Sequence, residues 1–496
     1  MKRKDILFLL LLTFLALLIH GYHPGAEDSE TYLPGIEKVL HPKLFPVGTE
    51  YFQLHAHLTL FPQVIAGSAR ISHLPFAWVL FLWQIASIFL FLLACRVLAG
   101  MLFRDARATW GGVALVAALL TLPVAGTALY IMDQYINPRN MTAFAVVFAV
   151  VYVLQMKFWR AALFLIFAAA IHPFMTCFAV SYCLLLAWMG ILKTATEARI
   201  ATAQDRASAP AIASVCLLLP LLPLSSAPKG YDAVAVSHAY QYLLQWRWYE
   251  MLGAIAPLGI LWGFRLLARK NKLANLELVC KSLVVYGAVY LFFGVLFSSS
   301  PVFESVARLQ PMRSLYLLYI LMILIGGCFL ARYVLKDRPL RWLALFLPLC
   351  AGMYTAQRAL FPDSAHVEWP GAAPKNPWVQ AFQWARQNTP EDAIFAINPD
   401  YMNLTGEDAN GFRAIAERSQ LADAVKDAGV VEMFPEIADG WQRQVRAQSG
   451  LRNFTPQEFQ SLRTKYGVRW VVLQQVDGSP LDCPYTNRAV KVCRVP

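Results

Sequence analysis

Long runs of uncharged, apolar residues constrain this chain more than any other feature. Such runs lack the charge that a solvated surface requires, and a helix that crosses the bilayer core needs roughly 20 mostly apolar residues. Of the 496 residues, 58% are hydrophobic and only 15% are charged, whereas a soluble domain averages roughly 25% charged residues. The sequence therefore predicts an α-helical polytopic membrane protein. The clearest runs are Val113 to Tyr130, Phe144 to Met156, Ala161 to Leu192, Leu283 to Phe297 and Leu315 to Ala331.

Positive charge is concentrated in the short loops between these runs. The formal net charge is +12, a value that also occurs in nucleic-acid-binding proteins. Here, however, 18 Lys and Arg against 5 Asp and Glu lie in the loops 1–5, 104–107, 157–160, 193–206, 265–272 and 332–341. Lys and Arg next to membrane spans mark the cytoplasmic side. We therefore expect a cytoplasmic N-terminus and no nucleic-acid partner.

About eleven membrane spans follow from the apolar runs between charged loops. Basic loops at every second connection support this count and place the C-terminus outside. The run 160–192 is short for two spans, but His172-Pro173 interrupts it, and proline disrupts a helix. One span there would reverse the charge pattern after Lys193, so two are expected. The predicted spans are 6–20, 75–98, 111–130, 141–156, 160–172, 174–192, 210–226, 250–267, 278–298, 313–331 and 340–358.

After Leu360 the composition becomes that of a soluble domain. Residues 361–496 carry 14 Lys and Arg and 16 Asp and Glu, with no apolar run of membrane length. We therefore divide the chain into a membrane domain, residues 1–360, with a long first outer loop at 20–74, and an extracytoplasmic α/β domain, residues 361–496. In the second domain, periodicity predicts helices at 374–388, 435–448 and 456–466 and strands at 393–397 and 468–474.

Two of the nine cysteines lie outside the apolar spans. Cys483 and Cys493 flank a stretch that can fold back as a hairpin around Thr486-Asn487. In an oxidising compartment we expect a disulfide between them, the alternative being two unpaired thiols.

Ionisable side chains gather on the predicted outer side of the membrane domain. Such groups at membrane depth are costly unless they face a cavity or pair with one another, so their convergence predicts a site. The pair His55-Ala56-His57 lacks a third ligand and does not share a helix face, so we expect no metal site there. The residues concerned are His23, Glu27 and Asp28 at the start of the first outer loop, Asp133 and Arg139 in the second, His172 between two spans, and Arg313 at the start of another.

This arrangement resembles the GT-C superfamily of integral membrane glycosyltransferases. The resemblance lies in Glu27-Asp28 directly after the first span, the long first outer loop, Asp133 in the next outer loop, about eleven spans and an outer α/β domain. It implies a location in the bacterial inner (plasma) membrane, with the C-terminal domain periplasmic or otherwise extracytoplasmic. The segments Gly21-Tyr22-His23-Pro24-x-x-Glu27-Asp28, Tyr135-x-Asn137-Pro138-Arg139 and His172-Pro173 further resemble uncharacterised bacterial membrane proteins.

The resemblance implies transfer of a sugar from a polyprenyl-phosphate carrier to an envelope acceptor. Glu27 or Asp28 would be the general base on the acceptor hydroxyl, and two adjacent carboxylates would raise one another's pKa. Asp133 would orient the acceptor or support the acidic pair, whereas Arg139 and Arg313 would bind the phosphate. His23 and His172 complete the expected substrate-binding set. Expected partners are membrane lipids and the lipid-linked sugar; no cofactor is expected, and a divalent cation and the oligomeric state stay open.

Each of these residues also has a purely structural alternative. The acidic pair would cap a helix, Asp133 and Arg139 would form an ion pair, and the arginines would anchor span ends. For the whole protein, the alternatives are a transporter or flippase of a lipid-linked or anionic substrate, or an envelope scaffold without catalysis. The enzyme is favoured because the acids lie in outer loops, no internal repeat is visible and a sizeable outer domain follows.

Overall fold

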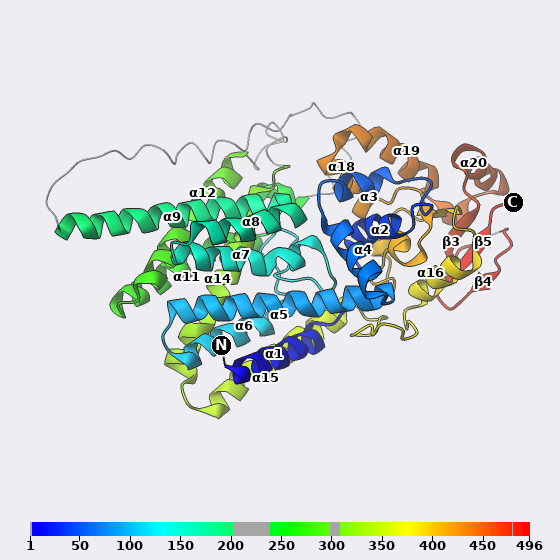
Figure 1. Cartoon of the computed structure of the whole chain (residues 1–496). Coiled ribbons are helices and arrows are strands. Elements are labelled where there is room, and N and C mark those ends of the chain that lie inside the picture. The colour runs from blue at the N-terminus through cyan, green and yellow to red at the C-terminus, as the bar shows by residue number, and fades with distance from the viewer. Residues whose placement is uncertain (1, 202–238, 298–307, 479) are drawn as a thin grey trace.

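The computed structural model describes residues 2–201, 239–297, 308–478 and 480–496. Apolar helices form an elongated bundle, and the C-terminal region with its sheet lies at one end of it (Figure 1). The predicted span 210–226 falls outside the described residues.

Each remaining predicted span corresponds to a helix over most or part of its length. Within the described residues, five segments are long and apolar enough to cross a membrane: Phe76–Leu102, Pro173–Leu192, Trp248–Lys270, Ala274–Phe297 and Pro311–Leu335. These segments support a membrane protein, while the count of eleven spans stays a prediction. The bundle helices are α1 (Arg3–His20), α5 (Phe76–Leu102), α6 (Ala106–Ala118), α7 (Pro138–Leu154), α8 (Phe158–Ile171), α9 (Pro173–Ala201), α11 (Trp248–Lys270), α12 (Ala274–Phe297), α14 (Leu315–Phe329), which continues as the π-helical segment Leu330–Leu335, and α15 (Pro339–Leu360).

The predicted span 111–130 is wrong in its second half. Helix α6 ends at Ala118, and residues 119–137 follow an irregular path. Pro123 explains this end, because in a continued helix its ring would clash with the carbonyl of residue 119 and its nitrogen could not donate. Ala125 and Ala128 then adopt left-handed backbone conformations, with φ of 43° and 55°. The apolar run therefore leaves the helix and forms a wall of the cavity described below.

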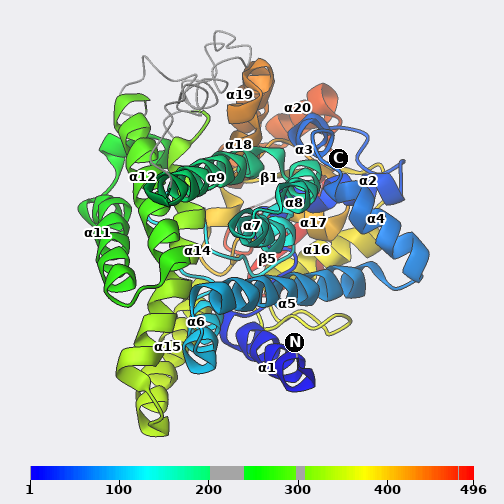
Figure 2. The ribbon, with the colours of Figure 1, turned by 60° about the vertical axis from the view of Figure 1, so that its left-hand side comes forward.

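The run 160–192 forms two helices, as its sequence predicts. His172, with φ −146° and ψ 76°, separates α8 from α9. Both helices pack against α7 and against each other, and Figure 2 shows the three side by side. The break places His172 at a bundle end, next to other polar segments.

A five-stranded mixed sheet organises the C-terminal region. β1 is parallel to β2 and β3, whereas β5 is antiparallel to β3 and β4. Alternate side chains face opposite sides, as the pleat of a strand requires: Phe395 and Trp470 pack with α16 (Pro377–Asn388) and α17 (Phe412–Ala416), and Val471 packs with α20 (Pro456–Tyr466). The sheet order is β2 (Ser419–Gln420), β1 (Ile394–Ile397), β3 (Trp470–Gln474), β5 (Val490–Arg494) and β4 (Tyr485–Thr486).

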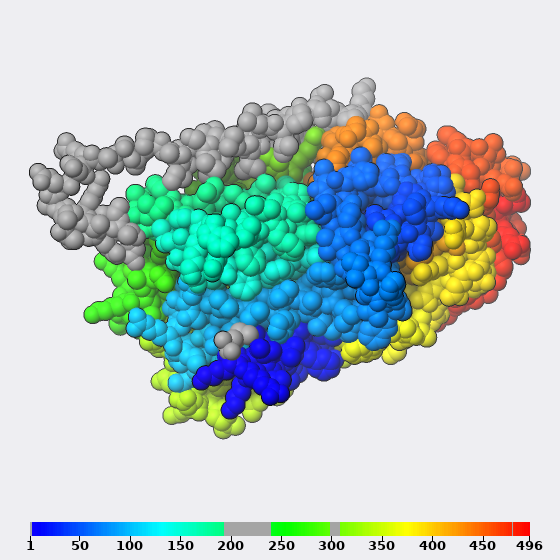
Figure 3. All heavy atoms as spheres, viewed as in Figure 1, coloured from blue at the N-terminus to red at the C-terminus, as the bar shows by residue number. Residues whose placement is uncertain are grey.

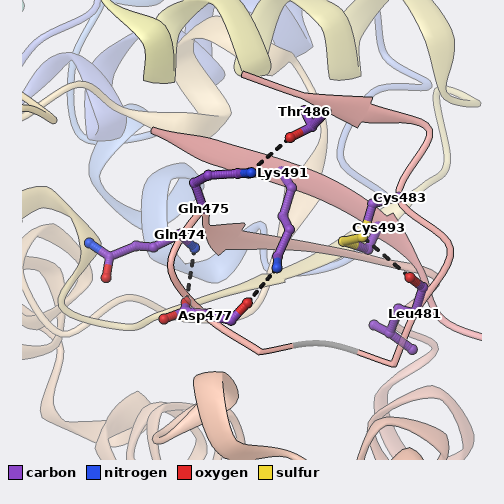
Figure 4. Close-up of a disulfide and its surroundings, with 8 residues drawn as sticks. All are labelled: Gln474, Gln475, Asp477, Leu481, Cys483, Thr486, Lys491 and Cys493. Atoms are coloured by element: carbon purple, nitrogen blue, oxygen red, sulfur yellow. Dashed lines mark hydrogen bonds between the residues drawn. A yellow bond between two sulfur atoms is a disulfide. The ribbon is translucent and has the colours of Figure 1, made fainter. Parts of the chain in front are cut away.

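The helices and strands predicted for this region match those of the structure. The predicted helix 435–448 is α19 (Ala438–Gln448) preceded by the 3₁₀ turn Pro435–Ile437. Cys483 is joined to Cys493 on β5 by a disulfide, next to the hairpin of β4 and β5 (Figure 4). The placement of this region outside the cytoplasm stays a prediction.

The first outer loop is packed between the bundle and the C-terminal region. It forms α2 (Ser29–Leu40), α3 (Glu50–Ala56) and α4 (Phe61–Ser72). Ile36 of α2 shares a core with Val79 of α5 and Ala414 of α17, and Tyr51 of α3 packs with Trp441 of α19. Figure 3 shows this segment in blue between the cyan bundle and the yellow and red C-terminal region. The loop therefore joins the two regions by apolar burial.

Candidate functional site

A cavity of about 580 Å³ lies where the bundle, the first outer loop and the C-terminal region meet. Among the segments that contribute polar groups to its wall are the turn before α2, helix α3, the segment 119–137, the start of α7, the break between α8 and α9, the 3₁₀ turn Pro311–Ser314 and the C-terminal segment 426–433. Because these segments are far apart in sequence, the fold itself assembles the site. Six of the seven predicted catalytic and substrate-binding residues line the cavity: Glu27, Asp28, Asp133, Arg139, His172 and Arg313. Their roles in catalysis stay predictions.

His23, the seventh residue, does not line this cavity. Its ring is buried and stacks on Phe361 with 4.0 Å between ring centroids. Its Nδ1 is hydrogen-bonded to Glu368 Oε1 at 2.9 Å. These contacts tie the segment after α1 to the segment after α15. The structure therefore gives His23 a packing position beside the cavity, and its contact with a substrate stays a prediction.

The acidic pair lies in a tight turn between α1 and α2. Glu27 has a left-handed φ of 56°, which is unfavourable for a residue other than glycine. Tertiary contacts hold the turn: the Glu27 N–H donates to the carbonyl of Ala409 at 2.7 Å, and the Asp28 N–H donates to the Tyr135 hydroxyl at 3.3 Å. The side chains of Glu27 and Asp28 remain 42% and 41% exposed. They are therefore accessible to a bound substrate.

A lysine that the sequence did not single out joins the two acids. Lys426 is the first residue of α18 (Lys426–Met433), in the C-terminal region. Its ammonium is paired with Glu27 and lies 3.0 Å from Asp28 Oδ1. Burial alone would lower the pKa of Lys426, but the two carboxylates raise it above its ordinary value. Lys426 is therefore charged at neutral pH. Nothing in the segment Val425-Lys426-Asp427 distinguishes it from an ordinary solvated helix start.

Positive charge decides the ionisation of Asp28. Burial favours its protonated form, but Lys426, Arg139 and Arg313 outweigh burial and hold the pKa of Asp28 below its ordinary value. The expectation that adjacent acids raise one another's pKa is therefore wrong for Asp28, because the cations around it dominate.

The carboxylate of Asp133 is hydrogen-bonded to neighbouring side chains. It is only 5% exposed, and its Oδ2 accepts hydrogen bonds from Arg139 and, at 2.5 Å, from Asn137. Asn137 also caps α7 by accepting from the Asn140 N–H at 2.8 Å. Burial raises the pKa of Asp133, and Arg139 and Asn137 offset part of that rise. These contacts agree with the structural alternative, an ion pair, and they fix Arg139 at the cavity wall.

Arg313 presents a positive charge to another part of the cavity. Its guanidinium carbon lies 5.7 Å from the centroid of Phe174, and within the described ranges it has no carboxylate partner. The preceding Gln310 has a left-handed φ of 44° and donates from Nε2 to Glu432 on α18 at 3.1 Å. This hydrogen bond ties the turn that carries Arg313 to α18, the helix that also carries Lys426. Arg313 is therefore the cation best placed to meet an anionic ligand.

A buried network behind the acidic pair links α2 to the C-terminal region. Arg413 of α17 lies 3.2 Å from Glu30 of α2 and donates two hydrogen bonds to Asp427 of α18, at 2.9 and 2.5 Å. Glu30 follows the acidic pair by two residues, and Asp427 directly follows Lys426. The buried guanidinium of Arg413 therefore holds α2, which begins directly after Asp28, against α18, which carries Lys426.

The cavity wall contains acids and histidines, which are potential metal ligands. In the described part of the chain, no group of three or more His, Cys, Asp or Glu side chains is arranged to hold a metal ion. Lys426 bridges the carboxylates of Glu27 and Asp28. His55 lines the cavity as well, and burial lowers its pKa to about 4, so its imidazole is neutral at pH 7.

Comparison with known proteins adds one structural likeness. No known family and no curated protein sequence matches this chain. Among solved structures, the crystal structure of the Archaeoglobus fulgidus oligosaccharyltransferase in complex with Zn and sulfate is similar, with a TM-score of 0.42 and 13% sequence identity. The alignment covers 94% of this chain and 67% of that chain. This score is too low to establish a common fold.

Proposed function

We propose that this protein is a membrane glycosyltransferase of the GT-C type, which moves a sugar from a polyprenyl-phosphate carrier to a hydroxyl of an envelope acceptor. One observation carries the proposal: accessible carboxylates and an arginine that pairs with no carboxylate among the described residues face the same cavity at one end of a bundle of apolar helices. Its volume of about 580 Å³ lies within the range of roughly 300 to 1,000 Å³ of small-molecule sites.

Sugar transfer requires a proton acceptor for the attacking hydroxyl, and we assign that role to Asp28. The acceptor oxygen attacks the anomeric carbon, the bond from that carbon to the phosphate oxygen breaks, and polyprenyl phosphate leaves with the bonding electrons. The hydroxyl proton passes to Asp28. A carboxylate with a lowered pKa is a weak base, but it is always ionised, and the hydroxyl becomes acidic as its oxygen bonds to carbon.

The leaving phosphate requires positive charge, and we assign it to Arg313 with support from Arg139. A guanidinium offers a planar set of donors that matches phosphate oxygens. Arg139 is oriented by Asp133, which makes Asp133 a positioning residue. Lys426 screens the repulsion between Glu27 and Asp28 and keeps both carboxylates near the acceptor.

The test compares Asp28→Asn and Glu27→Gln with the control Asp392→Asn, whose side chain is exposed in the C-terminal region. Purified variants in vesicles are assayed for transfer from a polyprenyl-phosphate sugar, and cells are profiled for lipid-linked sugars and envelope glycans. We expect Asp28→Asn to lower the transfer rate by about 10² to 10⁴, the usual worth of a general base, and Asp392→Asn to leave it unchanged.

Two results would overturn the proposal. One is unchanged glycan and lipid-linked sugar profiles in both single variants and in the double variant, with normal membrane insertion. The other is movement of a lipid-linked substrate across the vesicle membrane without any transfer, which would establish the transporter.

A further inference from the structure

The loops after two neighbouring parallel strands leave the sheet in opposite directions. After β1 the chain turns to β2 on one side, whereas after β3 it turns to β4 and β5 on the other. Because β1 and β3 are parallel, both loops start from the same edge of the sheet. Diverging loops leave a crevice at the carboxyl ends of such strands, and in open α/β sheets ligands bind there.

A second cavity, of about 290 Å³, lies in this crevice. Asn398 follows β1, Gln474 ends β3 and Asp477 lies in the next turn, while Arg452 of the turn Leu451–Asn453 also lines the cavity. No residue lines both this cavity and the cavity at Asp28. The crevice is therefore a separate site.

The floor and the rim of the crevice differ in character. Trp378 and Val472 belong to the buried core of the sheet, whereas Asn398 and Arg452 are exposed and Gln474 and Asp477 are partly exposed. The apolar floor, to which the partly buried Leu404 adds accessible surface, suits the C–H face of a pyranose ring. Amide, carboxylate and guanidinium groups around it match the donors and acceptors of sugar hydroxyls.

Charge and size narrow the choice of ligand. Asp477 and Arg452 contribute opposite charges, so the rim has no net charge that would select a phosphate or a nucleotide. The volume of about 290 Å³ lies at the small end of ligand sites, which run from roughly 300 to 1,000 Å³. Both features favour a neutral ligand of the size of one sugar unit.

The rim is held in place before any ligand arrives. Asp477 Oδ2 accepts from the Gln474 N–H at 2.9 Å, and the Asp477 carbonyl accepts from Lys491 of β5 (Figure 4). The disulfide between Cys483 and Cys493 closes the same loop onto β5. On the other side, the Asp400 N–H donates to Asn398 Oδ1 at 3.0 Å. Groups fixed in this way lose little conformational entropy on binding.

We propose that this crevice is a saccharide-binding site that holds one pyranose unit of the acceptor glycan, away from the cavity at Asp28. That the bound glycan is the acceptor rests on the proposed function, whereas saccharide binding does not. Asn398, Gln474, Asp477 and Arg452 bind the hydroxyls, and Leu404 contributes to the apolar floor.

The experiment uses the full chain in lipid nanodiscs and saturation-transfer NMR. The probes are the methyl pyranosides of glucose, galactose, mannose and N-acetylglucosamine, with inorganic phosphate as an anionic probe. We expect at least one pyranoside to bind, and Asn398→Ala and Arg452→Ala to weaken its binding by about five- to tenfold each, the worth of one hydrogen bond. The matched control Asn388→Ala removes an exposed amide at the end of α16 and should have no effect.

The proposal falls if no pyranoside binds, if Asn398→Ala and Arg452→Ala both bind like the unmodified protein, or if phosphate displaces the pyranoside. Asp28→Asn separates this proposal from the proposed function, because it should abolish transfer and leave pyranoside binding unchanged. If Asp28→Asn loses transfer but the unmodified protein binds no pyranoside, only the proposed saccharide site is overturned. Normal transfer in Asp28→Asn together with pyranoside binding would overturn only the assignment of Asp28.

Discussion

Replacing Arg413 by methionine should loosen the attachment of α2 to α18. Arg413 is 1% exposed. Its guanidinium forms an ion pair with Glu30 at 3.2 Å and donates hydrogen bonds to Asp427 at 2.9 and 2.5 Å. Methionine fills most of the same space without a charge, so the variant leaves three buried carboxyl groups, those of Glu30, Asp423 and Asp427, without their cation. Removing one partner of a buried ion pair typically costs about 3 to 5 kcal/mol.

The measurement is hydrogen exchange of the α2 and α18 amides with the protein in nanodiscs. Since about 1.4 kcal/mol corresponds to a factor of ten, the equilibrium for opening of these helices should rise between about 10²- and 10⁴-fold. The control Arg469→Met removes a pair with Asp392 at 3.7 Å whose side chains are 58% and 64% exposed, and it should cost less than about 1 kcal/mol. Unchanged protection of both helices in Arg413→Met would refute the reasoning.

The cost of Arg413→Met should also depend on pH. Burial raises the pKa of Glu30 to about 7 and that of Asp427 well above its ordinary value, and Arg413 opposes both rises. Without Arg413 both folded-state pKa values rise further. A carboxyl group whose pKa is higher in the folded state binds more protons when folded, so its contribution to stability is lost as pH rises through that pKa. The loss of stability caused by Arg413→Met should therefore be smaller at pH 5 than at pH 8. A loss of stability that does not change with pH would contradict this account.

Two further outcomes test other parts of the structure. Replacing Cys483 and Cys493 by serine should lower the free energy of unfolding by about 2 to 3 kcal/mol, the worth of a short closed loop, as measured by thermal unfolding, and an unchanged unfolding temperature would contradict a stabilising role of this disulfide. A reporter enzyme fused after Leu360 should be active only outside the cytoplasm, and cytoplasmic activity would overturn the predicted topology.

The sequence alone indicated the class of the protein and most of its helices and strands. Long apolar runs predict membrane helices because every residue in them would be costly to expose to water. His172-Pro173 marked the division between α8 and α9, and the C-terminal strands were predictable from short apolar runs with strand-favouring residues. The candidate acids and arginines were found for a similar reason, since ionisable groups beside membrane spans are costly without partners.

The tertiary structure decided what those residues contact. Lys426 meets Glu27 across 399 residues of sequence, and the contact exists because α2 and α3 pack against α17 and α18. In the tertiary structure Asp133 is hydrogen-bonded to Arg139, and His23 is hydrogen-bonded to Glu368 outside the cavity. Helix α6 ends before Pro123. Burial and helix formation depend on residues near one another in the chain, so sequence patterns reveal them. The pKa of Asp28 depends on charges brought from distant segments, and no local pattern contains that information.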